Sequence, residues 1–263
     1  MTMHNIKAEV ERIKGFIAGR MVLSGAKGVV VGISGGIDSA LVAKLCAMVL
    51  DKGRVHALFM PYGAQPVEDS YRVAKHLCIR PHTSAHTIQI GSEVDAIARR
   101  TRALDKISLG NIQARMRMVC LYAYANSNNL LVVGTSNRSE MLTGYFTKYG
   151  DGGCDFEPIA HLYKTEVWKM AKYLKLPAEI ISKKPSAGLW AGQTDEDELG
   201  MPYDKLDRIL EFIGLSADHY FRNPGTAALS TKTSEEEVER VAALMMKAGH
   251  KLKMPPTLPR IDL

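Results

Sequence analysis

Short apolar runs alternate with segments of helical periodicity through the first half of the chain. The runs have the composition of buried strands, which we expect at 29–33, 55–60, 85–90 and 130–134. Between them, apolar residues recur every three or four positions, as in helices that bury one face. We expect these helices at 5–23, 40–50, 67–77, 93–104 and 108–126. The alternation predicts an α/β fold of the Rossmann-like kind, an open parallel sheet with helices on both faces.

The pattern changes after Gly134. Residues 143–158 are rich in glycine and polar groups. Residues 182–200 combine Lys, Pro and Gly with a patch of acids, which indicates a mobile loop or lid. Helical spacing returns at 165–174, 203–213 and 235–247, and Thr233 or Ser234 is placed to cap the last of these helices. There is no internal repeat, so we expect one domain over residues 1–263.

Residues 32–39, Gly-Ile-Ser-Gly-Gly-Ile-Asp-Ser, join the first predicted strand to the next helix. Backbone N–H groups at a helix N-terminus are unpaired and the helix dipole is positive there, which favours an anion such as phosphate. The adjacent glycines permit close approach of the backbone, and the two serines add hydroxyl donors. Asp38 would repel phosphates unless a divalent cation lay between them. The loop therefore predicts a site for magnesium-bound pyrophosphate.

Two commoner phosphate loops do not match these residues. The Walker loop needs a lysine that is missing here, and glycines at 32, 35 and 36 do not form GxGxxG. What remains, SGGxDS after a strand, resembles the signature loop of the N-type ATP pyrophosphatases, which split ATP into AMP and pyrophosphate. The alternative is a plain strand-to-helix turn, which would not need Asp38 and Ser39.

Composition limits the class of protein. A chain of 263 residues, 46% hydrophobic and 24% charged, suffices for one globular α/β domain. No apolar run approaches the roughly 20 residues that span a bilayer, and the first residues do not resemble a signal peptide. We therefore expect no association with a membrane. A net charge of +6 suits the binding of polyanionic small molecules. Because the basic residues are scattered along the chain, we do not expect the protein to bind nucleic acid. The four cysteines form no CxxC pair. We expect a cytoplasmic protein with Cys46, Cys78 and Cys120 buried and Cys154 more exposed.

Longer motifs in the second half narrow the family. Three stretches resemble the NAD synthetases: 110–118 (GNIQARMRM), 134–137 (GTSN) with Glu140, and 143–153 (TGYFTKYGDGG). The likeness continues through Pro158, Lys164, 197–200 (DELG) and 250–251, and covers nearly the whole chain. No glutaminase domain is expected, so the chain is similar to the short, ammonia-dependent form. The resemblance implies a Rossmann-like fold of the adenine nucleotide alpha hydrolase type.

The resemblance also implies a reaction. NAD synthetases activate the nicotinate carboxylate of deamido-NAD with ATP, which forms an acyl adenylate and releases pyrophosphate. Ammonia then displaces AMP and leaves the amide of NAD. A free carboxylate is a poor acceptor because its leaving group would be oxide, whereas AMP leaves readily. Charge that grows on the α-phosphate must be neutralised by cations, so Mg²⁺ is the expected cofactor.

Site residues follow from the same resemblance. The expected magnesium ligands are Asp38 and Glu140, which follow the first and fourth strands and so meet at one sheet edge. The expected catalytic residues are Asp38 and Asp151, the latter to position ammonium or accept its proton. The expected ATP site comprises Gly32, Ile33, Ser34, Gly35, Gly36, Ile37, Asp38, Ser39, Thr135, Lys164 and Ser186. The expected deamido-NAD site comprises Arg115, Lys148, Asp155, His250 and Lys251. At position 186 the family often has Thr, and Ser keeps the hydroxyl.

Several of these residues have a structural alternative. Glu140 fits a solvated helix acid, Asp151 a turn-forming aspartate, and His250 a C-terminal helix cap. Arg115 and Arg117 lie two apart on one helix and cannot share a face, so one is expected to bind substrate and the other to pair structurally. We favour Arg115 for the substrate because it ends the Gly-Asn-x-x-Ala-Arg pattern.

The resemblance implies a homodimer with the deamido-NAD site at the subunit interface. Candidate contact surfaces are the apolar faces of 108–126 and of the first helix, for which core packing is the alternative. The rival functions are other N-type ATP pyrophosphatases, GMP synthetase-like or tRNA-modifying. A tRNA-modifying enzyme should add a nucleic-acid-binding module or catalytic cysteines, and neither is evident. A non-catalytic nucleotide-binding protein would have no need of Glu140, Lys148 and Asp155.

Overall fold

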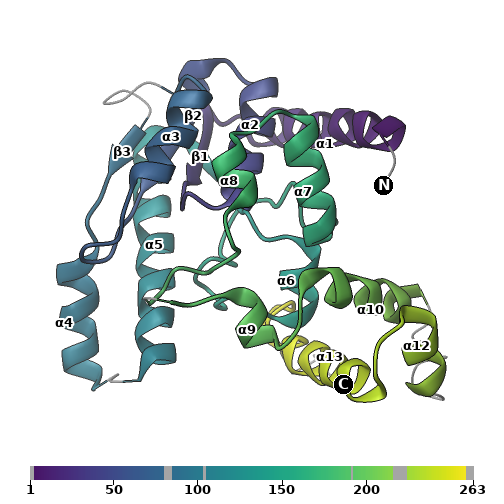
Figure 1. Cartoon of the computed structure of the whole chain (residues 1–263). Coiled ribbons are helices and arrows are strands. Elements are labelled where there is room, and N and C mark those ends of the chain that lie inside the picture. The colour runs from purple at the N-terminus through teal and green to yellow at the C-terminus, as the bar shows by residue number, and fades with distance from the viewer. Residues whose placement is uncertain (1–2, 80–84, 103–104, 191, 216–223, 259–263) are drawn as a thin grey trace, which may run out of the picture.

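A parallel sheet of four strands forms the centre of the structure (Figure 1). The computed structural model describes residues 3–79, 85–102, 105–190, 192–215 and 224–258. The strands are β1 Gly28–Gly32, β2 Val55–Phe59, β3 Ala85–Thr87 and β4 Leu130–Val133, in the order β3-β2-β1-β4. Val31 of β1 pairs with Ala57 of β2 on one side and with Val133 of β4 on the other. The order therefore reverses between β1 and β4, and in such sheets ligands bind beyond the carboxyl ends at that point.

Helices cover both faces of the sheet. On one face lie α1 Met3–Ser24, α2 Ile37–Val49, α3 Glu68–His76, α7 Lys164–Tyr173 and α8 Ala178–Ser182. The other face is covered by α4 Gly91–Thr101 and α5 Lys106–Asn128 (Figure 1). Because successive strand residues point to opposite faces, Val29 and Val31 enter the first core and Val30 enters the second. The strands are thus apolar throughout, as a sheet buried on both faces requires.

A third core lies beside the sheet, among helices of the second half of the chain (Figure 1). It is built by α6 Arg138–Thr143, α10 Tyr203–Leu215, α12 Pro224–Thr231 and α13 Glu235–Ala248, with α9 Asp195–Leu199 at its edge. Leu206, Ile209 and Leu210 of α10 are fully buried in it. Since α6 follows β4 directly, this core begins where the sheet ends.

The observed elements confirm the predicted α/β fold and most of the predicted helices. The third strand is shorter than predicted, since Ile90 already forms the N-cap of α4. Four short helices, α6, α8, α9 and α12, were not predicted, because five to eight residues show too few turns for a helical period. The prediction that 182–200 is all loop is wrong in part, since Thr194 caps α9.

The predicted burial of the cysteines is only partly correct. Cys78 is exposed rather than buried, because it follows the end of α3 with φ 56° and leaves the apolar face of that helix. Cys46 is buried, whereas Cys120 and Cys154 are partly buried. None of the helices in the described part of the chain has the length and apolar character needed to cross a membrane.

The start of α13 offers a test of the fold. Ser234, rather than Thr233, caps this helix: its hydroxyl accepts from Glu237 N at 3.2 Å, and Glu237 Oε2 accepts from Ser234 N at 3.0 Å. Ser234→Ala should lower the free energy of unfolding by about 1 kcal/mol, measured in urea. Ser230→Ala, at an exposed position of α12, should change it by less than about 0.5 kcal/mol. Equal effects of both would contradict the capping role.

Candidate active site

The loop 32–39 lies at the carboxyl end of β1 and leads into α2. Gly35 has φ +77°, and a Cβ added there would lie 2.8 Å from Asp69 Cβ, so both its conformation and its surroundings require glycine. The Ser34 and Ser39 hydroxyls are 3.2 Å apart. Gly36 is the N-cap of α2, and no side chain caps this helix. The helix N-terminus therefore presents its amides and dipole at the loop, which is the arrangement that binds phosphate.

Three charged side chains meet beside this loop, and we call them the acid–lysine cluster: Asp38, Glu140 and Lys164. Lys164 Nζ lies 2.5 Å from Asp38 Oδ2 and 3.5 Å from Glu140 Oε1. Asn137 Nδ2 donates to the other oxygen of Asp38 at 3.0 Å. The predicted meeting of Asp38 and Glu140 at one sheet edge is thus seen, and Lys164 lies between them.

Local structure explains why the cluster forms. Asp38 stands in the first turn of α2, Glu140 in the first turn of α6, and Lys164 is the first residue of α7. Asn137 and Glu140 form a capping box, in which each side chain bonds the other's backbone N–H. Glu140 is therefore not a solvated helix acid, and Asn137, to which the sequence assigned no role, orients both acids.

The cluster is largely buried, and its two carboxylates share one ammonium group. The Lys164 side chain is 2% exposed, against 17% for Asp38 and 16% for Glu140. Burial and the Asp38 carboxylate raise the pKa of Glu140, with Lys164 opposing them. Burial alone would lower the pKa of Lys164, but the carboxylates of Asp38 and Glu140 raise it well above its usual value. The lysine therefore stays charged, and the acids keep some access to a ligand.

The donor set suits Mg²⁺, which prefers carboxylate oxygens combined with phosphates and water. Two carboxylates share a single ammonium, so an added divalent cation would neutralise excess negative charge. Across the described ranges, no group of three His, Cys, Asp or Glu side chains is arranged to hold a metal ion. Asp38 and Glu140 are therefore the residues of the cluster that could hold such an ion.

A third acid, Asp195, lies close to the cluster and was not predicted. It is 3% exposed, its Oδ2 accepts from Tyr203 Oη at 3.1 Å, and its Oδ1 has no hydrogen-bond partner among the described residues. Lys164 Nζ lies 5.3 Å from the centre of the Tyr203 ring. Burial raises the pKa of Asp195, and Lys164 counteracts this. The sequence offered a weak signal, since Asp195 directly follows the capping Thr194.

Two predicted ATP residues, Thr135 and Ser186, have no hydrogen bond or ion pair with the cluster in the described part of the chain. Thr135 follows β4 and is partly exposed. Ser186 is exposed, and its hydroxyl accepts from Gly188 N at 3.0 Å. Two hydrogen bonds attach the loop that carries Ser186 to α5 and to the segment before α3. Gln113 Nε2 donates to Leu189 O at 3.2 Å, and Gln65 Nε2 donates to Gly188 O at 2.6 Å.

Four of the five predicted deamido-NAD residues lie together, and we call them the basic cluster: Arg115, Lys148, His250 and Lys251. Arg115 Nη2 donates to Lys148 O at 3.3 Å, and Lys148 Nζ donates to His250 O at 2.6 Å. Lys251 Nζ donates to Gly144 O at 2.6 Å. α5, the glycine-rich stretch and the end of α13 therefore meet here. His250 takes part through its carbonyl group, and Gly249 is the C-cap of α13.

The remaining predicted residues hold the backbone in place. Asp155 Oδ2 accepts from Val132 N at 2.7 Å and Oδ1 from Tyr122 Oη at 3.1 Å, so Asp155 fastens the end of β4 rather than joining the basic cluster. Asp151 Oδ1 accepts from Thr147 N at 2.8 Å, which is the turn-forming alternative.

Arg117 is the structural member of the arginine pair. Its Nε donates to Met60 O at 3.0 Å and its Nη2 to Gln65 Oε1 at 2.9 Å. Burial lowers the pKa of Arg117. Arg115, by contrast, is exposed. The preference for Arg115 as the arginine free to meet a ligand agrees with this division.

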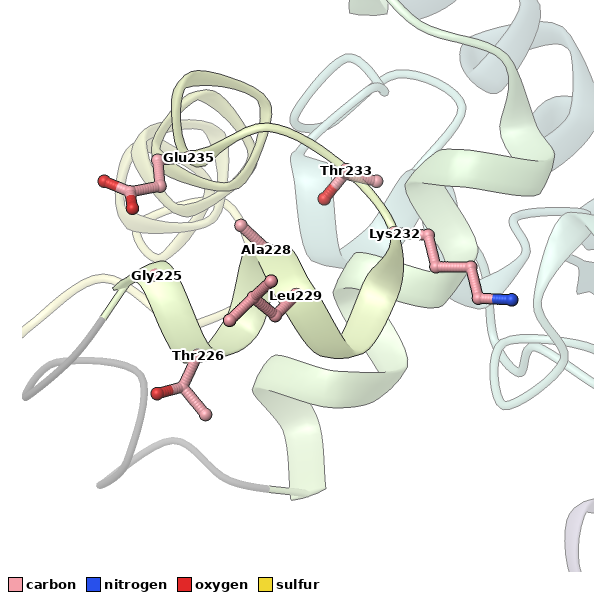
Figure 2. Close-up of a pocket in the computed structure, with 7 residues that line it drawn as sticks. All are labelled: Gly225, Thr226, Ala228, Leu229, Lys232, Thr233 and Glu235. Carbon is pink, nitrogen blue, oxygen red and sulfur yellow. The ribbon is translucent and has the colours of Figure 1, made fainter.

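Open cavities also lie away from both clusters. One, of about 720 Å³, is lined by residues of α12, the turn after it and the start of α13 (Figure 2). Another, of about 690 Å³, lies between α7, α8 and α10. Neither is lined by a predicted site residue. The chemistry-bearing residues gather instead at the carboxyl edge of the sheet.

Comparison with known proteins agrees with this geometry. The chain is 49% identical over 239 residues to the NH(3)-dependent NAD(+) synthetase of Pyrococcus furiosus, covering 90% of this chain and 89% of that protein. With the corresponding protein of Archaeoglobus fulgidus the identity is 44% over 263 residues, covering 98% and 99%.

Solved structures point the same way. The NH3-dependent NAD synthetase of Campylobacter jejuni superimposes with a TM-score of 0.80 at 34% identity, covering 98% of this chain and all of that one. An NMN synthetase from Francisella tularensis gives 0.82 at 34% identity, covering 96% and 98%. The family model described as NAD synthase matches residues 9–255. The chain therefore belongs to the NAD synthase family.

Proposed function

We propose that the acid–lysine cluster and the basic cluster serve the two halves of one reaction, the ATP-dependent amidation of deamido-NAD with ammonia. As a member of its family the chain is a carbon–nitrogen ligase, and its products are NAD, AMP and pyrophosphate. The convergence of Asp38, Glu140 and Lys164 beside the 32–39 loop carries the proposal. This arrangement unites an anion site, two carboxylates and a buried cation where ATP would be activated.

The first half-reaction is assigned to the residues around α2. Amides and hydroxyls of 32–39 bind the pyrophosphate part of ATP, which becomes the leaving group. Asp38 and Glu140 are the residues that hold Mg²⁺, which when bound supplies positive charge to the phosphates. Lys164 adds a fixed cation for the charge that grows at the α-phosphate, and Thr135 and Ser186 complete the site with hydroxyl donors.

The second substrate is assigned to the basic cluster. Deamido-NAD carries two phosphates and a carboxylate, so the cations of Arg115, Lys148 and Lys251 suit it, with His250 beside them. Asp155 supports this site indirectly, as the residue that fixes the end of β4. Asp151 shapes the neighbouring turn, and we retain it as a residue that positions the nitrogen donor.

The assembly and setting belong to the same proposal. We propose a homodimer that meets through α5, because Val119 and Ile107 of that helix are 51% and 70% exposed. The apolar face of α1, by contrast, packs in the core, as Ile13 and Ile17 show. The four free thiols are in keeping with a cytoplasmic enzyme. A single synthetase domain that uses free ammonia fits relatives of nearly the same length.

A direct assay tests the function. The chain is incubated with ATP, Mg²⁺, deamido-NAD and ammonium, and NAD, AMP and pyrophosphate should appear in equal amounts. Glutamine in place of ammonium should support little product. Because one structural neighbour is named NMN synthetase, nicotinate mononucleotide is included as a second acid. Release of AMP with some other acid, and none with deamido-NAD, would favour another N-type ATP pyrophosphatase.

Asp38→Asn tests the acid–lysine cluster. The amide keeps the shape of the side chain but removes the charge that Mg²⁺ and Lys164 require. Pyrophosphate release with saturating ATP and deamido-NAD should fall by about a hundredfold or more. Asp51→Asn, just beyond the other end of α2 and exposed, should leave the rate within about twofold. Unchanged pyrophosphate release in Asp38→Asn would remove Asp38 from its role.

The two arginines of α5 test the basic cluster. Arg115→Ala should raise the KM for deamido-NAD by about tenfold or more through loss of a charge-assisted contact, with little change in unfolding. Arg117→Ala should instead lower the free energy of unfolding by about 2–3 kcal/mol, because Met60 O and Gln65 Oε1 lose their buried donor. The reverse assignment of effects would contradict the division of roles.

A further inference from the structure

Asp195 is a buried acid beside the acid–lysine cluster that has no part in the mechanism above. Its Oδ2 accepts from Tyr203 Oη at 3.1 Å, whereas its Oδ1 is buried and has no hydrogen-bond partner among the described residues. No Lys, Arg or His of the described ranges forms a direct ion pair with it. Such a carboxylate calls for an explanation, because burying a charge is unfavourable unless the charge is paired.

Tyr203 connects Asp195 to Lys164. The tyrosine is 1% exposed, Lys164 Nζ lies 5.3 Å from the centre of its ring, and its hydroxyl donates to Asp195. Besides burial and the other members of the cluster, the charge of Asp195 acts on the pKa of both Glu140 and Lys164. Asp195 therefore lies within electrostatic range of the ammonium group without bonding it directly.

The helix α9 holds Asp195 in this position. At its start, Thr194 caps the helix and Asp195 N donates to Pro185 O at 3.1 Å. At its end, Arg240 Nε donates to Leu199 O at 3.0 Å. Both ends of α9 are thus fastened to other parts of the chain, and the carboxylate stays against the cluster instead of turning toward solvent.

The charges of this region are out of balance when no ligand is bound. Asp38, Glu140 and Asp195 are three carboxylates around the single ammonium group of Lys164, and such an excess of buried negative charge is unfavourable. When Asp38 and Glu140 serve as ligands of Mg²⁺, the divalent charge compensates them. Lys164 then needs a counter-ion whose charge is not already compensated. Asp195 is placed to be that counter-ion.

We propose that Asp195 is a positioning residue, the counter-ion that keeps the ammonium group of Lys164 in place while Asp38 and Glu140 hold Mg²⁺. This inference rests on the ATP half of the proposed function. Lys164 then stays charged and directed at the phosphates, where the first half-reaction needs it, and Asp195 itself touches neither the nucleotide nor the metal. The carboxylate should therefore destabilise the protein without ligands and strengthen the binding of nucleotide together with Mg²⁺.

Asp195→Asn tests the proposal by binding without turnover. The probe is α,β-methylene ATP, which cannot release pyrophosphate, and its affinity is measured by calorimetry with and without Mg²⁺. Mg²⁺ should strengthen binding to the wild type, and in Asp195→Asn this gain should be smaller by about tenfold. Binding without Mg²⁺ should not weaken, because a negative charge near the phosphates has been removed. An unchanged gain, or an equal loss with and without Mg²⁺, would overturn the proposal.

The stability of the ligand-free protein separates this role from a structural one. Because the variant removes one of three carboxylates around one ammonium group, its unfolding temperature should equal that of the wild type or exceed it by about 2–4 °C. A carboxylate that served only to hold α9 and α10 together would instead be missed on unfolding. An Asp195→Asn protein that unfolds at a lower temperature than the wild type would therefore contradict the proposed role.

Two further variants complete the design. Tyr203→Phe removes the hydroxyl that bonds Asp195 and keeps the ring beside Lys164, so the gain from Mg²⁺ should fall by about threefold. Asp204→Asn, at an exposed position of α10, should match the wild type in every measurement, and an effect equal to that of Asp195→Asn would overturn the proposal. These binding measurements need no deamido-NAD. If the wild type formed no NAD from deamido-NAD, the proposed function would fail, and the role of Asp195 would still be decided by nucleotide binding.

Discussion

The buried ammonium of Lys164 is the group on which the rest of the site depends. It is the first residue of α7, yet it reaches Asp38 at the start of α2 and Glu140 at the start of α6. Removal of either acid would leave a buried charge poorly compensated, which is far more unfavourable than loss of a surface pair. The contact joins the sheet with its covering helices to the helical core of the second half. The geometry of the acid–lysine cluster, which we propose for ATP, and the packing of the two cores are therefore linked through one side chain.

A hydrogen-bond network around Ser139 and Asp207 supports the acid–lysine cluster. Ser139 Oγ donates to Asp207 Oδ1 at 2.5 Å and accepts from Lys164 N at 3.0 Å, while Asp207 Oδ2 accepts from Thr165 N at 2.8 Å. The first amides of α7 are thus satisfied by α6 and α10. Because helix starts need such partners, the same bonds that cap α7 also fix where Lys164 emerges. The same bonds thus stabilise the start of α7 and fix the position of Lys164.

The acids of the glycine-rich stretch after β4 have a different arrangement. Asp155 Oδ2 and Asp151 Oδ1 accept from backbone amides of β4 and of the glycine-rich turn, and Asp155 Oδ1 accepts from Tyr122 Oη. Glu157 lies two residues beyond Asp155, and its buried Oε2 has no hydrogen-bond partner among the described residues. The distinction between these three acids comes from their hydrogen bonds and not from their type. It shows why an acid-rich motif does not by itself reveal which carboxylate meets the substrate.

The sequence by itself determined the α/β fold, the glycine-rich loop between β1 and α2, and the position of Asp38 and Glu140 at one sheet edge. Apolar periodicity, glycine spacing and the sheet-edge rule are local or topological signals. It also ranked Arg115 above Arg117. Only the tertiary structure decided that Lys164 joins the two acids and that Asp155 fastens β4. It also decided that Asp195 and Glu157 each have one buried oxygen without a hydrogen-bond partner among the described residues. Those properties depend on contacts between residues far apart in the chain, and on the desolvation that packing imposes, which no local pattern encodes.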